Sequence, residues 1–162
     1  MADPPTRPRC VFDCVVLLQA AVSRRGPAFA LLTLVEAGRL ELLISDGIIA
    51  ELREVLARPA VQRKFPLLTA DVVAAFIAKL IAIATPVQTE PPLFRLPRDP
   101  DDELYINLAL AGNARYLITR DRDLLDLSAG VTREAQNLYR LRPELRILDP
   151  VALLHELNAK RQ

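Results

Sequence analysis

The sequence predicts an α/β domain in three layers, with a central, mostly parallel sheet and helices on both of its faces. Short apolar runs of strand length alternate along the chain with longer segments whose apolar residues recur at helical spacing. Consecutive parallel strands need a crossover, which is usually a helix, so this alternation favours a parallel sheet. The 162 residues are 51% hydrophobic, which is enough to bury one sizeable core.

Four segments are expected to form strands, because each is a short, mainly aliphatic run, the pattern of strands buried on both faces of a sheet. They are CVFDCVVLL (10–18), RLELLIS (39–45), RYLIT (115–119) and LRIL (145–148).

The expected helices begin at capping residues or prolines and end at glycine or proline. Gly38 is expected to end the first helix, and Asp46 to cap the start of the second. Thr69 is expected to cap ADVVAAFIAKLIAIA, which forms the larger part of the third. The helices cover AFALLTLVEAG (28–38), GIIAELREVLAR (47–58), residues 60–82, DELYINLALAGNA (102–114) and VALLHEL (151–157), the last after Asp149-Pro150.

Residues 1–9 are rich in proline and arginine and are expected to form a flexible N-terminal tail, with residues 10–162 as a single domain. Residues 85–100 have prolines at 91, 92, 97 and 100 and are expected to be an ordered surface loop. Residues 127–143 are expected to be irregular or partly helical.

Charge and cysteine content exclude several classes of protein. The 21 basic and 20 acidic residues give a net charge of +1, which excludes a strongly basic nucleic-acid-coating protein. Cys10, Cys14 and the single histidine, His155, support neither a disulfide framework, nor a zinc site, nor a His-based catalytic triad. The start of the chain has no apolar signal region, and no apolar run has the length of a membrane span. The cytoplasm is therefore the expected location.

Acidic residues gather where strands are expected to end. Seven of the 20 acids lie between residues 99 and 126, before and after the expected strand 115–119. Asp13 lies in the first apolar strand, and Glu51 borders the buried face of the helix that follows the second strand. In open parallel sheets, functional groups gather at the carboxyl ends of the strands.

Each of these acids also has a structural interpretation. Asp13 and Asp121 could each cap a helix that follows a strand, and Glu51 could be a solvated helical residue. One or two acids of DPDDE (99–103) are expected to serve as the N-cap and first-turn acids of the next helix. Capping needs no more than that, whereas four like charges repel one another unless something positive lies among them.

Carboxylates without a nearby histidine or cysteine are the ligands that Mg²⁺ or Mn²⁺ prefers. Such an ion polarises a phosphodiester and activates a water molecule for attack. The motifs GxxxxGK[ST] and GxGxxG are absent, so sites for nucleoside triphosphates or dinucleotides are not supported.

In their order and spacing, three landmarks resemble the PIN domain, a metal-dependent nuclease fold. The similarity is greatest to the VapC-like toxin components of type II toxin–antitoxin pairs. The landmarks are VFD (11–13), GRLELLIS followed by ELREVLARP (38–45 and 51–59), and RDPDDELYINLALAGNARYLITRDRDLL (98–125).

The resemblance implies four catalytic residues that also bind the metal ion: Asp13, Glu51, Asp102 and Asp121. Asp123 is implied as an assisting metal ligand, and Thr119 as a hydroxyl residue beside the metal. Asp101 or Glu103 is an alternative to Asp102 as the third acid.

The resemblance also implies a Mg²⁺- or Mn²⁺-dependent endoribonuclease, the toxin of a pair whose small antitoxin blocks the acidic pocket, and a homodimer. Of the 21 basic residues all but three are arginines, which suit contacts with RNA phosphates. The candidates for such contacts are Arg24, Arg25, Arg53, Arg58, Arg63, Arg120 and Arg122.

One motif departs from the family. The usual Asp-Thr-Asn is Asp13-Cys14-Val15 here, and Val15 cannot form the hydrogen bonds of the asparagine side chain. A catalytically impaired PIN module that binds RNA or metal without turnover is therefore an alternative. A doubly wound enzyme that handles other phosphate compounds with a Mg²⁺ site is a further alternative.

Overall fold

The computed structural model describes residues 7–161 and contains a five-stranded, all-parallel sheet of order β3-β2-β1-β4-β5. The predicted α/β class is therefore confirmed. The strands are β1 (Arg9–Phe12), β2 (Glu41–Ile44), β3 (Thr85–Pro86), β4 (Tyr116–Ile118) and β5 (Arg146–Leu148). Because the strands run the same way, their carboxyl ends meet at one edge of the sheet.

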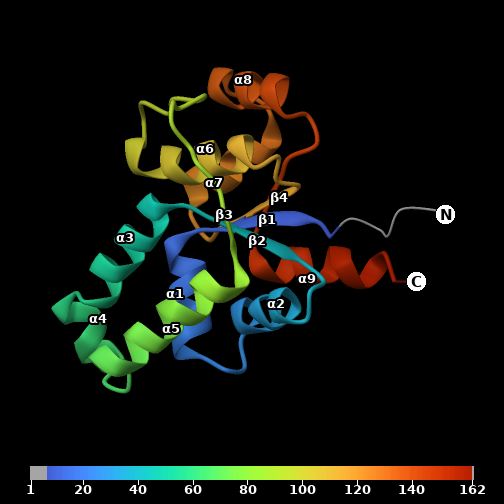
Figure 1. Cartoon of the computed structure of the whole chain (residues 1–162). Coiled ribbons are helices and arrows are strands. Elements are labelled where there is room, and N and C mark those ends of the chain that lie inside the picture. Colours follow the sequence, from blue (N-terminus) through green and yellow to red (C-terminus); the bar gives the residue numbers. More distant parts are fainter. Residues whose placement is uncertain (1–6, 162) are drawn as a thin grey trace.

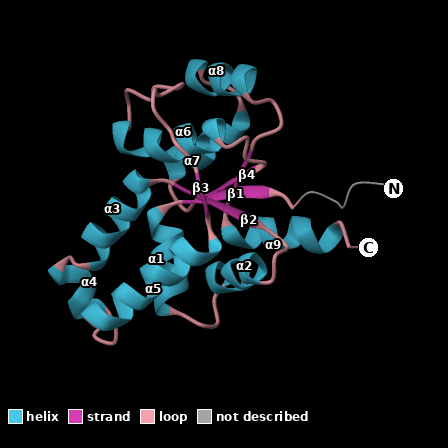
Figure 2. Cartoon of the chain, viewed as in Figure 1, coloured by secondary structure: helices cyan, strands magenta, loops and turns pink. Residues whose placement is uncertain are grey.

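Helices connect the strands and enclose the sheet. The helices are α1 (Cys14–Val22), α2 (Pro27–Glu36), α3 (Asp46–Leu56), α4 (Pro59–Lys64), α5 (Ala70–Ile83), α6 (Glu103–Ala111), α7 (Arg122–Asp126), α8 (Arg133–Leu141) and α9 (Pro150–Ala159), with the 3-10 helices η1 (Pro100–Asp102) and η2 (Leu127–Ala129). In Figure 1, α6, α7 and α8 lie above the sheet, and α1, α2 and α9 lie below it. Figure 2 shows the strands in the middle of this helical shell.

The core is centred on β1 and β4. The side chains of Cys10–Phe12 and Tyr116–Ile118 are at most 1% exposed. Strands covered on both faces read as continuous apolar runs, which explains why the sequence predicted them. At the end of α6, a Cβ on Gly112 would lie 2.3 Å from Cδ1 of Leu43, so glycine lets this helix approach β2 closely.

The first strand is shorter than the sequence predicted. It ends at Phe12, and residues 14–18, which the apolar pattern places in the same strand, begin α1 instead. The reason is Asp13, whose Oδ1 accepts the N–H of Val16 at 2.8 Å and so caps α1. At its other end β1 starts at Arg9, inside the segment expected to be a tail; residues 1–6 lie outside the described residues.

Two further helices differ from expectation. Ser45, rather than Asp46, caps α3, because its Oγ accepts the N–H of Ile48 at 3.3 Å. The helix expected over 60–82 is divided into α4 and α5, and Thr69 caps α5 as predicted.

The two segments predicted as loops contain some regular structure. Residues 85–100 begin with the short strand β3, in which Thr85 pairs with Leu43 of β2. Residues 127–143 contain α8, so the prediction of partial helix is confirmed.

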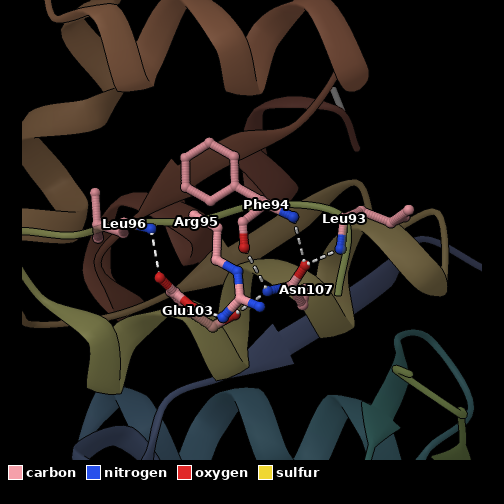
Figure 3. A network of polar contacts seen from close by, with 6 residues as sticks. All are labelled: Leu93, Phe94, Arg95, Leu96, Glu103 and Asn107. Atoms are coloured by element: carbon pink, nitrogen blue, oxygen red, sulfur yellow. Dashed lines mark hydrogen bonds and ion pairs between the residues drawn. The ribbon is translucent and has the colours of Figure 1, made fainter. Parts of the chain in front are cut away.

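The rest of the proline-rich segment is held against α6 by two side chains of that helix (Figure 3). Asn107 accepts the N–H groups of Leu93 and Phe94 at 2.8 and 2.9 Å, and donates to the carbonyls of Phe94 and Glu103 at 3.0 Å. Glu103 accepts the N–H of Leu96 at 2.7 Å. Phe94 and Leu96 are buried, so the segment is ordered as predicted.

Within residues 7–161, no single helix is both long and apolar enough to cross a membrane. The pair α1 and α2 passes that test of length and composition only when joined, with a bend of 91° between them.

We expect Asn107→Ala to lower the free energy of unfolding by about 2–4 kcal/mol, because the buried N–H and carbonyl of Phe94 and the part-buried N–H of Leu93 would lose their partner. The control is Asn137→Ala, at an exposed position of α8, which should change stability by less than about 0.5 kcal/mol. Urea unfolding followed by circular dichroism measures both changes. Equal effects at the two positions would contradict the role assigned to Asn107.

Candidate active site

Two of the predicted site acids lie at the carboxyl ends of neighbouring central strands. Asp13 directly follows β1, and Asp121 lies three residues after the end of β4. The two strands are paired in parallel, with Phe12 opposite Ile118, so both acids are at the same edge of the sheet. The backbone N–H of Asp13 donates to the carbonyl of Ile118 at 3.0 Å and joins the two strand ends.

The Asp13 carboxylate is 4% exposed and is surrounded by donors. While Oδ1 caps α1, Oδ2 accepts the hydroxyl hydrogen of Thr119 and, at 3.3 Å, the N–H of Arg120. Burial raises the pKa of Asp13, and the hydrogen bonds from Thr119, Val16 and Arg120 oppose that rise. The capping role foreseen for Asp13 is therefore confirmed, and its second oxygen points towards the end of β4.

Thr119 connects Asp13 with Asp121. Its hydroxyl donates to Asp13 and accepts the N–H of Asp121 at 2.9 Å. In turn, Oδ1 of Asp121 accepts the N–H groups of Asp123 and Leu124 at 2.8 and 3.3 Å, so Asp121 caps α7 as predicted. Asp13 and Asp121 thus start the helices that follow the two central strands, β1 and β4.

The end of the proline-rich segment adds a carboxylate that was not among the predicted ligands. Carboxylate oxygens of Asp99, Asp121 and Asp123, one from each residue, lie within 4.8 Å of one another. Three oxygen donors this close can hold a metal ion.

Asp102 is the strongest sign that a cation fits here. It is 8% exposed, and its Oδ2 has no hydrogen-bond partner within residues 7–161. Burial, followed by the negative charges of Asp121 and Asp99, a side-chain hydrogen bond with Asp99 and the charge of Asp13, raises the pKa of Asp102 to about 8. A buried carboxylate oxygen that lacks a donor and faces other acids is the arrangement that a divalent cation would satisfy.

Helix capping does not account for the acids of residues 99–103. Asp99 precedes η1 and Asp102 precedes α6, but neither side chain accepts a capping hydrogen bond. As predicted, Asp102 occupies the N-cap position of α6 and Glu103 lies in its first turn, but the Asp102 side chain makes no capping hydrogen bond.

The alternatives to Asp102 are placed differently. The carboxylate of Glu103 is directed to the proline-rich segment, where it accepts the N–H of Leu96 and pairs with Arg95 at 3.4 Å. Asp101 is exposed. The charges of Asp121 and Asp13 both raise the pKa of Asp102, so this candidate lies close to the other site acids.

Glu51 reaches the site through a tyrosine. Its Oε2 accepts the hydroxyl hydrogen of Tyr105 at 2.5 Å, and the same hydroxyl oxygen accepts the N–H of Cys14 at 3.2 Å. Burial, then the charges of Glu51 and Asp13, raise the pKa of Cys14 to about 12, so both acids lie near the start of α1. Within the described residues, no hydrogen bond joins Glu51 directly to the other predicted ligands.

Sequence reasoning did not single out three residues that the structure brings to this region: Asp99, Arg98 and Tyr105. Asp99 was visible as part of the acidic run, but its return towards Asp121 depends on the fold. Arg98 pairs with Asp123 at 2.8 Å. A tyrosine inside an apolar helical segment reads as a core residue, so nothing in the sequence marked the hydroxyl of Tyr105.

A surface cavity of about 800 Å³ lies between the start of α3, Leu104 of α6 and residues 86–90. Its lining includes Asp46 and Arg53 but none of the five predicted ligands. The acidic site is therefore separate from this cavity.

Solved structures with a similar fold include PAE2754 from Pyrobaculum aerophilum, with 18% identity, a TM-score of 0.53, and coverage of 93% of this chain and 90% of that chain. VapBC2 from Rickettsia felis, bound to a DNA fragment from their promoter, is 13% identical, with a TM-score of 0.51 and coverage of 87% and 98%. At these identities the likeness shows the fold alone. No match was found among curated proteins.

The first landmark, the acidic run and the end of β4 all fall within residues 9–123, which match the family model described as the PIN domain. This match spans more than half of the chain and agrees with the resemblance drawn from the sequence, so the chain belongs to the PIN domain family.

Proposed function

We propose that this PIN domain protein is a metal-dependent endoribonuclease that hydrolyses RNA phosphodiester bonds. The observation that carries the proposal is the buried, unpartnered oxygen of Asp102 among the carboxylates of Asp13, Asp99 and Asp121. These charges repel one another unless a cation lies among them. Membership of the PIN domain family favours nuclease chemistry for such a site.

Four residues are proposed to be catalytic and to bind the metal ion: Asp13, Glu51, Asp102 and Asp121. Asp123 is proposed as a further ligand. When bound, Mg²⁺ or Mn²⁺ would polarise the phosphodiester and lower the pKa of a coordinated water. The protein's own part is to orient the acids: Thr119 fixes one oxygen of Asp13, and Tyr105 fixes one oxygen of Glu51.

The biological role proposed here is that of a toxin with a small antitoxin partner, and the toxin is proposed to act as a homodimer in the cytoplasm. The fold likeness to VapBC2 and the resemblance of the motifs to VapC-like toxins support this role. RNA is the proposed substrate.

Val15 favours a second candidate, a PIN module that binds RNA or metal without turnover. The side chain of Val15 is half-exposed and has no hydrogen-bonding group. Val15 lies in the first turn of α1, and the start of this helix is nevertheless held, because the hydroxyl of Tyr105 accepts the N–H of the neighbouring Cys14. This contact makes the endoribonuclease the preferred proposal.

Asp13→Asn and Asp121→Asn should each lower Mn²⁺-dependent RNA cleavage at least about 100-fold while the fold is retained. Asparagine keeps an oxygen that can cap α1 or α7 but removes the charge that binds a cation. The control is Asp149→Asn, because Asp149 follows β5 and caps α9 through the N–H of Ala152 at 2.8 Å without joining the acidic cluster.

Cleavage of a labelled RNA pool, with circular dichroism as the test of folding, measures these effects. Unchanged activity in both cluster variants would overturn the site assignment. Absence of Mn²⁺-dependent cleavage by the wild type would favour the module without turnover.

Without divalent cations, the raised pKa of Asp102 should make the protein less stable as the pH rises from about 4 to about 8. The folded state binds this proton more tightly than the unfolded state, so its stabilising effect is complete at low pH and is lost as the folded carboxyl ionises. Asp102→Asn imitates the protonated form. In EDTA, the free energy of unfolding of this variant should therefore rise relative to that of the wild type as the pH approaches 8. Urea unfolding over a series of pH values measures the difference. If the two proteins showed the same dependence on pH, the raised pKa of Asp102 would be contradicted.

A further inference from the structure

We infer that Arg98 is a substrate-positioning residue, which neutralises the acidic cluster before a cation binds and contacts an RNA phosphate afterwards. This inference rests on the proposed function and assigns a role to a residue outside the predicted ligands.

Arg98 is the basic side chain placed directly on the acidic cluster. Its Nη2 lies 2.8 Å from Oδ1 of Asp123, whose carboxylate is grouped with those of Asp99 and Asp121. Within residues 7–161, this is the one salt bridge to any of the five predicted ligands. The side chains of Arg98 and Asp123 are 48% and 46% exposed, so the guanidinium can leave the carboxylate by rotation about its own side-chain bonds.

The backbone on both sides of Arg98 is anchored, which fixes where its side chain can reach. On one side Leu96 is buried, and its N–H is bound by Glu103. On the other side the N–H of Asp99 donates to the carbonyl of Leu96 at 3.0 Å, and the N–H of Asp102 donates to the carbonyl of Asp99 at 3.2 Å. Residues 93–96, shown in Figure 3, form the anchored base of this turn. Arg98 is therefore a movable side chain on a fixed backbone.

A mobile positive group suits a site that must accept both a cation and an anionic phosphate. A phosphodiester that approaches several carboxylates meets repulsion, which a metal ion relieves only where the ion is bound. A cation that takes the oxygens of Asp123 competes with Arg98 for them. The released guanidinium remains at the rim of the cluster, where its planar donors suit bidentate contact with a phosphate.

Arg95 is a matched control on the same segment. Its side chain is 74% exposed and pairs at 3.4 Å with Glu103, which is not one of the grouped carboxylates of Asp99, Asp121 and Asp123. A general effect of positive charge or of loop stability would appear at both arginines. A role of Arg98 at the cluster would appear at Arg98 alone.

The test compares the wild type with Arg98→Gln, Arg98→Lys and Arg95→Gln in two assays. The first is calorimetric titration with Mn²⁺ alone. The second is fluorescence anisotropy of a labelled single-stranded RNA at 4 °C over a series of salt concentrations, with Ca²⁺ in place of Mn²⁺ to limit cleavage and gels to show that the RNA stays intact.

Arg98→Gln should bind Mn²⁺ about 2–5-fold more tightly, because a competing cation of modest strength is removed. The same variant should bind RNA about 10-fold more weakly, and the slope of log K against log salt should fall by about 0.7, the loss of one phosphate contact. Arg98→Lys should restore part of the RNA affinity and the slope, and Arg95→Gln should match the wild type in both assays.

These opposite changes separate a positioning role from a structural one, since damage to the fold would weaken both ligands. Unchanged or weaker Mn²⁺ binding by Arg98→Gln would overturn the inference, as would an equal loss of RNA affinity in Arg95→Gln. If the wild type binds RNA without cleaving it, the opposite shifts would still support Arg98 while the nuclease proposal failed.

Discussion

The Asp13 carboxylate caps α1 with one oxygen and, with the other, accepts hydrogen bonds from Thr119 and Arg120 beyond the end of β4. This double use joins two strands that are distant in the sequence. Thr119 extends the connection to Asp121, which in turn starts α7. The relative positions of the acids therefore depend on the parallel pairing of β1 with β4, and a change at this edge would disturb both helix starts and the proposed ligands.

A second constraint is the proline-rich segment, which carries Arg98 and Asp99 to the same edge. Asn107 and Glu103 of α6 hold its backbone, while Asp102 at the start of α6 faces the cluster. One helix therefore anchors the segment and adds a carboxylate of its own to the site. Acids from three separate parts of the chain meet there, and among residues 7–161 the pair of Asp123 with Arg98 is their one salt bridge.

Much of the fold and part of the site could be predicted from the sequence, because local patterns determine them. Apolar runs revealed the central strands, and Thr69 revealed the start of α5. The extent of β1 was misjudged because residues 14–18 are as apolar as a strand, and only the cap by Asp13 turns them into a helix. The contributions of Asp99, Arg98 and Tyr105 depend on contacts between distant segments, which neither periodicity nor spacing reveals.

The most direct test of the central claim is Mn²⁺ and Mg²⁺ binding by calorimetry, on the wild type and on the double variant Asp13→Asn/Asp121→Asn. A carboxylate cation site at the β1–β4 edge predicts binding by the wild type and its loss in a double variant that remains folded. Undiminished affinity in the double variant, or no binding of either ion by the wild type, would contradict the account.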